Sequence, residues 1–290
     1  MVKQCTVGVL RAGSVLVGLS LTIPSAAQNS PYPQRIHCNL RAGVLVTRTV
    51  RSWADGRRAV LSVAALDLCA GRYALTLSTP QRGRRTLSQG AQGHNVLVAI
   101  NGDYFSLSTR LPEGPARAQG TLWPTAPLTH HDALVQLTAD GVVRIHPVQA
   151  SGIPALRAAF ASVTAQPGDV FSARELVLDE GQPRLSPHIA HDGQRHPRTA
   201  LGVSRDGRLA WLVVIDGRTQ TSAGATVEEL SAVMQSLGAW RAVKLDGGGS
   251  SEMFARGLGV INHPSDGHER IVSQHVMVRG TRVGSPAICR

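Results

Sequence analysis

The stretch TALGVSRDGRLAWLVVID, residues 199–216, decides the fold class of this chain. Two runs of alternating or apolar residues, 199–203 and 209–216, flank a turn that contains Asp206 and Gly207. Asp-Gly between two such runs is typical of a tight β-hairpin. The sequence therefore predicts two antiparallel strands joined by a short turn.

A helix is predicted directly after this hairpin, in ATVEELSAVMQSLG at residues 225–238. Thr226 is a suitable N-cap residue, and Glu229 three positions later completes a capping box. Apolar residues recur at helical spacing until Gly238, which ends the pattern. Because this apolar stripe fits a packing face completely, we assign it to the core and give it no ligand role.

Further strands are predicted on both sides of this region, and residues 111–128, rich in Pro and Gly, are predicted to form a long surface loop. Residues 152–192 show no legible pattern. Short turns and neighbouring strands predict an α+β fold, with largely antiparallel mixed sheets and a few packed helices in a single domain. The other predicted strands are 43–50, 59–66, 73–77, 95–100, 133–137, 142–145 and 242–245.

The N-terminus has the pattern of a signal peptide. Lys3 and Arg11 precede an apolar run, and small residues up to Ala27 follow it. We predict removal of residues 1–27, leaving residues 28–290 as one exported domain, periplasmic or secreted, with no stable membrane insertion. The alternative is that this segment is retained as a membrane anchor.

The charge of the chain is strongly basic. The net charge is +11, and removal of the predicted signal peptide, with its two basic residues, leaves +9. Such a field favours polyanionic partners, which outside the cytoplasm means a phosphorylated sugar or anionic glycan more readily than nucleic acid. A solvated surface charge without function is the alternative.

Three cysteines remain after this cleavage, in a compartment where disulfides persist. Cys38 and Cys69 flank the first predicted strands and are our preferred pair, which leaves Cys289 unpaired. Pairing of Cys289 with either of the other two is the alternative. None of the three has a close Cys or His at ligand spacing, so we expect no metal site from them.

Polar clusters follow three of the predicted strands. A single Asp-Gly after a strand is ordinarily a turn, but three consecutive glycines add backbone freedom that folding must freeze. A run of glycine amides forms a concavity that binds anions. Neither the P-loop nor the dinucleotide-binding pattern is present. The clusters are Asn101-Gly102-Asp103, Asp216-Gly217-Arg218 and Asp246-Gly247-Gly248-Gly249-Ser250-Ser251.

Two arginines lie close in sequence to these clusters. Arg198 and Arg218 are suited to forked contacts with phosphate oxygens, although pairing with a local aspartate is the alternative for each. The polar loop 262–270 contains Asn262 and Asp266, whose side chains suit hydrogen bonds to sugar hydroxyls.

Two other kinds of site are less favoured. His188, His191 and His196 with Asp192 fall in an irregular loop that fixes no ligand geometry, so we predict surface histidines and no metal site. Ser250 or Ser251 could also be a nucleophile, but the sequence around them lacks the Gly-x-Ser-x-Gly elbow and indicates no partner histidine. A hydroxyl that donates to substrate is the better interpretation.

The order of these motifs resembles the phosphodiester glycosidases, a family that includes a lysosomal enzyme and exported bacterial proteins. The resemblance extends over about residues 95–278. One departure is Asp103, which stands where the family commonly has a second glycine. The matching motifs are NGDYF at 101–105, PRTALG at 197–202, VVIDGR at 213–218, LDGGGSS at 245–251 and NHPSD at 262–266.

This resemblance implies an exported hydrolase that cleaves the glycosidic bond of a sugar-1-phosphodiester and releases free sugar. The transition state resembles an oxocarbenium ion, so a carboxylate is needed near the anomeric carbon. We predict that Asp246 attacks this carbon or activates water, with Asp216 or Asp103 as its partner. The predicted substrate contacts are Asn101, Gly102, Arg198, Thr199, Arg218, Gly247, Gly248, Gly249, Ser250, Ser251, Asn262 and Asp266.

No cofactor is required by this mechanism, and the sequence leaves undecided whether a divalent cation lies among the three aspartates. Two other functions are the alternatives. One is a non-catalytic envelope module that binds anionic exopolysaccharide, and the other is a phosphodiesterase that cuts the P–O bond. The sugar, its anomer, the acceptor and the oligomeric state are also undecided.

Overall fold

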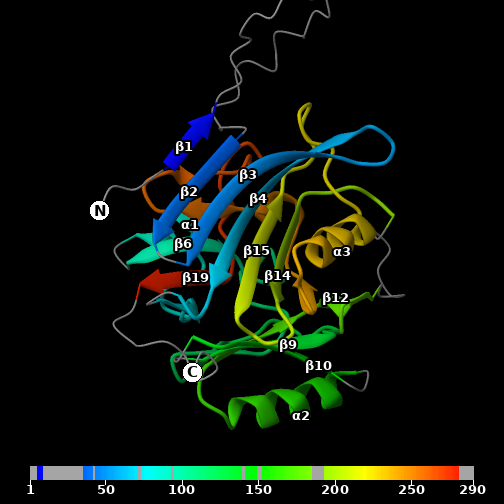
Figure 1. Cartoon of the computed structure of the whole chain (residues 1–290). Helices are drawn as coiled ribbons and strands as arrows, with labels where there is room; N and C mark the ends of the chain where they lie inside the picture. The colour runs from blue at the N-terminus through cyan, green and yellow to red at the C-terminus, as the bar shows by residue number, and fades with distance from the viewer. Residues whose placement is uncertain are drawn as a thin grey trace, which may run out of the picture.

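The computed structural model describes residues 5–8, 35–41, 43–70, 73–92, 95–138, 141–148, 152–184 and 193–280. These residues form three sheets whose neighbouring strands are all antiparallel, together with three α-helices (Figure 1). The predicted α+β class with largely antiparallel sheets is confirmed.

The largest sheet has nine strands and crosses the whole molecule (Figure 1). Its centre is formed by the two strands of the predicted hairpin. In sheet order the strands are β1 (Cys5–Gly8), β2 (Arg35–Arg41), β3 (Val44–Ser52), β4 (Arg58–Asp67), β15 (Leu209–Ile215), β14 (Arg198–Val203), β16 (Arg241–Lys244), β12 (Glu175–Asp179) and β13 (Gln182–Pro183).

Two five-stranded sheets complete the fold. One contains, in sheet order, β10 (Val143–Pro147), β9 (Ala133–Leu137), β11 (Asp169–Ala173), β7 (Ala116–Ala118) and β8 (Thr121–Leu122). The other contains β18 (Gly259–Val260), β17 (Met253–Ala255), β6 (Val96–Asn101), β19 (His275–Gly280) and β5 (Tyr73–Leu77).

The main hydrophobic core contains side chains from all three sheets. Leu212 of β15, Phe171 of β11 and Ile100 of β6 are each fully buried in it. Apolar burial is the dominant favourable term in folding, so this shared core fixes the sheets relative to one another. Polar residues at the ends of β6, β14 and β16 are thereby held at defined positions.

The predicted hairpin is formed by β14 and β15. Arg198 lies opposite Ile215, and Val203 lies opposite Ala210. The Asp-Gly turn joins the strands, and Gly207 has a φ of 70°, in the left-handed region that favours glycine.

Helix α3 (Val227–Ser236) confirms the predicted capped helix. The Thr226 side chain accepts a hydrogen bond from the Glu229 N–H at 3.1 Å, and the Glu229 carboxylate accepts one from the Thr226 N–H at 2.9 Å. Gly238 ends the pattern with a φ of 92°. The apolar face of α3, which includes Leu230 and Met234, packs against Trp211 and its neighbours in a second hydrophobic cluster.

The prediction of a surface loop over residues 111–128 is wrong in part. This segment contains β7 and β8, and β7 pairs with β11. Trp123 is buried, and its indole Nε1 donates a hydrogen bond to the Ser78 carbonyl at 3.0 Å. Proline and glycine marked the turns correctly, but the alternation Ala-Arg-Ala at residues 116–118 is too short to stand out as a strand.

Residues 152–192, which had no legible pattern, contain α2 (Ile153–Thr164), β11, β12 and β13 among the described positions. Helix α2 covers the sheet of β9 and β10 at the bottom of Figure 1. The alanines of α2 weaken the contrast in hydrophobicity between its two faces, and Leu156 is the only residue of the helix that is buried. Helix α1 (Leu87–Ala91) is a single capped turn and was not predicted either.

Parts of the terminal predictions lie outside the described residues. Cys5–Gly8 falls within the predicted signal peptide and forms the edge strand β1, while residues 9–34 and Cys289 are not described. No described helix is long and apolar enough to span a membrane. Cys38 and Cys69 are not free thiols, and their pairing stays a prediction.

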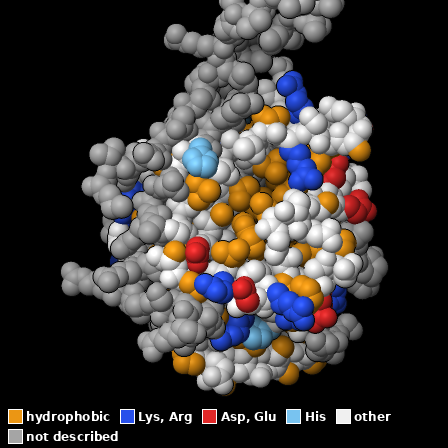
Figure 2. All heavy atoms as spheres, in the orientation of Figure 1, with side chains coloured by type: hydrophobic (Ala, Val, Ile, Leu, Met, Phe, Trp, Pro, Cys, Tyr) orange, Lys and Arg blue, Asp and Glu red, His pale blue; other side chains and the backbone are white. Residues whose placement is uncertain are grey.

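Figure 2 shows that hydrophobic side chains lie across the middle of the face seen in Figure 1. Lys, Arg, Asp and Glu side chains are found mainly toward its lower edge and its right-hand rim. On this face, therefore, both signs of charge lie around an apolar centre.

Thr226→Ala removes the N-cap of α3, and we expect it to lower the free energy of unfolding by about 1 kcal/mol, since one helix amide loses its partner. Urea denaturation measures the difference. Thr226→Ser keeps the hydroxyl and should stay within a few tenths of a kcal/mol of the wild type. Equal losses for both variants would show that the methyl group, rather than the cap, matters.

Candidate active site

Asn101 joins three strand ends at the candidate site. Its side-chain Nδ2 donates a hydrogen bond to the Asp246 carbonyl at 2.8 Å, and its Oδ1 accepts one from the Thr199 hydroxyl at 2.8 Å. The Asp246 N–H in turn donates to the Gly102 carbonyl at 3.3 Å. The polar ends of β6, β14 and β16 therefore meet, as the sequence predicted for Asn101, Gly102, Thr199 and Asp246.

The glycine turn after Asp246 is packed too closely for side chains. A Cβ on Gly247 would lie 2.9 Å from the Pro197 carbonyl oxygen, and one on Gly249 would lie 2.2 Å from the Asp266 carboxylate. Gly248 has a φ of 60° and donates its N–H to Pro197 at 3.0 Å. Steric crowding and positive φ thus account for three consecutive glycines.

Asp246 has a pKa raised to about 6. Burial is the main cause, and the charge of Asp103 adds to it, while hydrogen bonds from Ser250 and the Gly247 N–H act in the opposite direction. The residue nevertheless keeps part of its surface in contact with solvent. A carboxyl group that titrates near neutral pH at an accessible strand end is suited to acid, base or nucleophilic chemistry.

Asp103 is buried beside this carboxylate. One of its oxygens lies 3.2 Å from Nε2 of His131, a fully buried imidazole whose Nδ1 contacts the Thr129 carbonyl at 3.0 Å. The angle at this short contact does not meet hydrogen-bond geometry, and among the described residues neither carboxylate oxygen has a hydrogen-bond partner. Asp103 therefore acts on Asp246 through its charge in this structure.

Asp216, the other predicted partner, lies in a separate ion pair. Its carboxylate contacts Arg48 Nη2 at 2.5 Å and accepts a hydrogen bond from the His263 N–H at 3.1 Å. Burial raises the pKa of Asp216, and the Arg48 charge opposes the rise. Its link to the glycine turn is indirect, through Asn262, whose Nδ2 donates to the Ser251 carbonyl at 2.8 Å.

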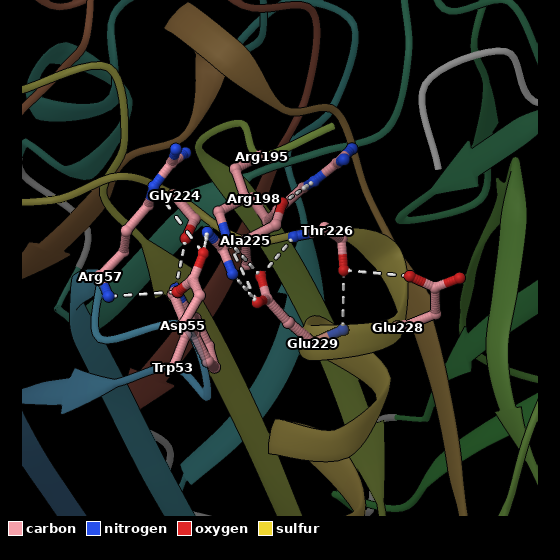
Figure 3. Close-up of polar contacts among 10 residues, drawn as sticks. All are labelled: Trp53, Asp55, Arg57, Arg195, Arg198, Gly224, Ala225, Thr226, Glu228 and Glu229. Atoms are coloured by element: carbon pink, nitrogen blue, oxygen red, sulfur yellow. Dashed lines mark hydrogen bonds and ion pairs between the residues drawn. The ribbon is translucent and has the colours of Figure 1, made fainter. Parts of the chain in front are cut away.

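The two predicted arginines differ in their surroundings. Arg198 is buried, and its guanidinium donates to the carbonyls of Ala225 at 2.9 Å and Gln194 at 2.8 Å (Figure 3). Arg218 is exposed and lies against Gly248, with Nη2 at 2.9 Å from His196 Nδ1. Of the two, only Arg218 faces both the turn and solvent.

Figure 3 also shows the ion pairs of Arg195, close to Arg198. Its neighbour Arg195 binds the Glu229 carboxylate at 2.9 Å and Asp55 at 2.5 Å, and Glu229 also caps α3. Arg195 and Arg198 together therefore attach the start of α3 to the start of β14.

Arg270 is a site residue that the sequence reasoning did not single out. It contacts the Asp266 carboxylate at 2.6 Å, and its Nη1 donates a hydrogen bond to the Ser250 hydroxyl at 3.3 Å. This guanidinium therefore borders the glycine turn on the side of Gly249. Its position four residues after Asp266, in a loop already marked as polar, was the available signal.

A buried charged cluster beneath Asp246 was also missed. Lys244 is fully buried, forms an ion pair with Glu175 and donates to the Tyr104 hydroxyl at 2.5 Å. Burial lowers the pKa of Lys244, and the charge of Glu175 opposes this effect. A lysine inside the apolar run 242–245 was the sequence signal, since buried lysines are rare unless paired.

Glu252 is a third residue missed by the sequence reasoning. It is fully buried, its carboxyl accepts a hydrogen bond from the Arg270 N–H at 2.8 Å, and its own N–H donates to Asn101 at 3.3 Å. Burial raises its pKa to about 8. At neutral pH this carboxyl is therefore mainly protonated.

The described residues contain no group of three or more potential metal ligands. His188, His191 and Asp192 lie outside them, and His196 contacts Arg218. The absence of a predicted metal site thus stays a prediction.

Residues 94–279 match the sequence profile of the phosphodiester glycosidases. The match covers well over half of the chain, which therefore belongs to this family of enzymes. The expectation drawn from the ordered motifs is confirmed at this level.

Solved structures with the same fold support the assignment. The catalytic domain of zebrafish N-acetylglucosamine-1-phosphodiester alpha-N-acetylglucosaminidase, auto-inhibited by its pro-peptide, has a TM-score of 0.62 and 16% identity, covering 96% of this chain and 88% of that one. A hypothetical protein from Synechocystis has a TM-score of 0.61 and 18% identity, covering 87% of this chain and 64% of that one. At these identities the likeness shows the fold alone.

Two further relatives are more limited matches. A protein of Burkholderia pseudomallei K96243, described as a candidate exported protein, has a TM-score of 0.58 and 19% identity, covering 77% of this chain and 74% of that one. The uncharacterized SPbeta prophage-derived protein YomE of Bacillus subtilis is 42% identical over 78 residues, which span 27% of this chain and 12% of that protein.

Glu252→Gln should stabilise the protein at pH 8 relative to the wild type. In the folded protein the pKa of Glu252 is about 8, above its ordinary value of 4.5. Folding is therefore favoured by the protonated Glu252 carboxyl, fully so below pH 4.5. This contribution to the free energy of unfolding is lost as the pH rises from 4.5 through 8. Gln keeps the acceptor for Arg270 without the charge. Relative to the wild type, the free energy of unfolding of Glu252→Gln should be about 1–3 kcal/mol more favourable at pH 8 than at pH 4.5. Urea denaturation of both proteins at the two pH values measures this difference.

The exposed Glu228→Gln serves as the matched control, and its change in stability between the two pH values should be smaller than that of Glu252→Gln. Parallel stability curves for the wild type and Glu252→Gln would contradict the raised pKa of Glu252.

Proposed function

We propose that this protein hydrolyses the glycosidic bond of a sugar-1-phosphodiester outside the cytoplasm and releases the free sugar. One observation carries the proposal. Asp246, with its pKa raised to about 6, opens a glycine turn that Arg218 borders on one side and Arg270 on the other. A carboxylate next to two guanidinium groups suits a substrate with an anomeric carbon bonded to phosphate.

The net reaction is a substitution at the anomeric carbon. The oxygen of water forms a bond to this carbon, and the bond between the carbon and the phosphate oxygen breaks. The electron pair of that bond leaves with the phosphate monoester, and a proton of the water passes to a base. Asp246 acts either as this base or as the nucleophile of a covalent intermediate that water then hydrolyses.

The cationic groups lie where charge develops on the leaving phosphate. Arg218 is exposed against Gly248, and Arg270 is partly exposed beside Gly249 and Ser250. Arg198 is assigned a different role from the one predicted, since its guanidinium holds two backbone carbonyls. A phosphate ester leaves readily as an anion, so strong protonation of the leaving group is less necessary than for an alkyl glycoside.

The two remaining predicted aspartates are assigned supporting roles. Asp103 lies close enough to raise the pKa of Asp246, whereas Asp216 is neutralised by Arg48. Export is supported by the signal-peptide pattern and by the likeness to a protein described as a candidate exported protein.

Asp246→Asn should reduce the release of free sugar at least about a thousandfold, because an amide neither takes a proton nor attacks the anomeric carbon. The measurement is product analysis with a panel of sugar-1-phosphate methyl esters and a nucleotide sugar. In the wild type, kcat/KM should rise as the pH increases through about 6, where Asp246 becomes ionised.

Asp206→Asn, in the exposed turn between β14 and β15, is the control and should keep wild-type turnover. Retained turnover in Asp246→Asn would exclude the mechanism. Sugar phosphate as the product would indicate a phosphodiesterase, and binding without turnover by the wild type would indicate a glycan-binding module.

Arg218→Ala should raise KM for a sugar-1-phosphodiester about tenfold, since a hydrogen bond to a charged group contributes about 1.5–3 kcal/mol. Steady-state kinetics measure this change. Arg205→Ala removes an arginine that lies over Trp240 instead, so its KM should stay unchanged. Equal effects of both substitutions would mean that only the net charge of the protein matters.

A further inference from the structure

We infer that a cavity beside the glycine turn binds the leaving-group alcohol of the phosphodiester, and that this alcohol has an apolar alkyl or aryl body. The inference rests on the proposed function and adds a substrate class to it. The cavity has a volume of about 520 Å³. Its walls come from the start of α1, the loop after β6 and the loop before β19, with Leu107, Arg110, Arg270 and Ile271 among the lining residues.

A short chain of contacts connects this cavity to Asp246. The carboxylate of Asp246 is hydrogen-bonded to the side chain of Ser250, and the Ser250 hydroxyl accepts a hydrogen bond from Arg270 Nη1 at 3.3 Å. Arg270 is itself part of the cavity wall. A phosphodiester whose sugar lies at Asp246 and whose phosphate lies along the turn therefore directs its other ester group toward the cavity.

The apolar side chains of the cavity are unusually exposed. Five large hydrophobic residues are exposed among the described part of the chain, and two of them line this single cavity. Leu107 is 62% exposed and Ile271 is 45% exposed. Aliphatic side chains gain free energy when a ligand covers them, so two of them in one cavity favour an apolar group.

Several polar side chains of the cavity are already bound within the protein. The Asp266 carboxylate pairs with Arg270, the Glu269 carboxylate accepts the Ser88 N–H at 2.8 Å, and the Thr86 hydroxyl caps α1. These side chains can therefore form fewer hydrogen bonds to sugar hydroxyls than polar side chains without partners in the protein could form. The cavity thus fits an apolar ester group better than a second sugar.

Two arginines lie beside this apolar surface, together with the carboxylates of Asp266 and Glu269. Arg110 is held over the Phe105 ring at 5.7 Å, and Arg270 borders the turn. An arginine suits the phosphate at the head of an apolar group, whereas its stem covers apolar surface. The combination matches an amphiphilic phosphodiester, with the anionic phosphate at the turn and the apolar body over Leu107 and Ile271.

The test uses two substrates with the same sugar, its 1-phosphate methyl ester and its 1-phosphate hexyl ester. The wild type should hydrolyse the hexyl ester with a KM about tenfold lower. The double variant Leu107→Asn, Ile271→Asn should lose this preference, because polar side chains replace the apolar contacts. The preference is read as the ratio of the KM values for the two esters, measured with the same preparation of each variant.

Leu122→Asn and Leu209→Asn are the matched controls, since both leucines are exposed and lie outside the cavity. Both controls should keep the preference for the hexyl ester. Equal KM values for the two esters in the wild type, or a preference that survives in the double variant, would overturn the subsite alone. Failure of the wild type to hydrolyse either ester would overturn the proposed function and this inference with it.

Discussion

The candidate site depends on the side chain of Asn101. One amide group binds the Thr199 hydroxyl in β14, and the Asp246 carbonyl and the Glu252 N–H at the two ends of the glycine turn. A buried amide that satisfies this many partners holds them in one arrangement, because any displacement leaves a polar group without its hydrogen bond. The Asp246 carboxylate and the glycine turn are therefore attached to the core rather than carried on a free loop.

The charges around Asp246 differ from those around two other buried acids of the site. Glu175 is paired with Lys244, and Asp216 is paired with Arg48, so each of these buried acids has a cation in contact. Asp246 instead has the carboxylate of Asp103 as a neighbour and remains partly accessible to solvent. Burial and like charge together place its titration near neutral pH, where a group that exchanges a proton with substrate is most useful.

The parts of the fold that follow from local chemistry were predictable from sequence. The β14–β15 hairpin and α3 depend on a turn dipeptide, a capping box and short-range periodicity, and all of these are visible along the chain. The partnership of Arg48 with Asp216 joins residues far apart in the sequence, so no local pattern indicates it. Arg198 illustrates the same difficulty. The motifs around it in the sequence suggested that it binds phosphate, whereas in the fold its guanidinium donates to backbone carbonyls.

The replacement of a family glycine by Asp103 gains a physical meaning from this arrangement. A glycine at that position would remove a negative charge that raises the pKa of Asp246, so Asp246 would ionise at a lower pH. The added carboxylate is buried, and the Nε2 atom of His131 lies 3.2 Å from one of its oxygens. Asp103 therefore affects the protonation of Asp246 through its charge, and a single substitution at a strand end changes the pH at which the Asp246 carboxylate titrates.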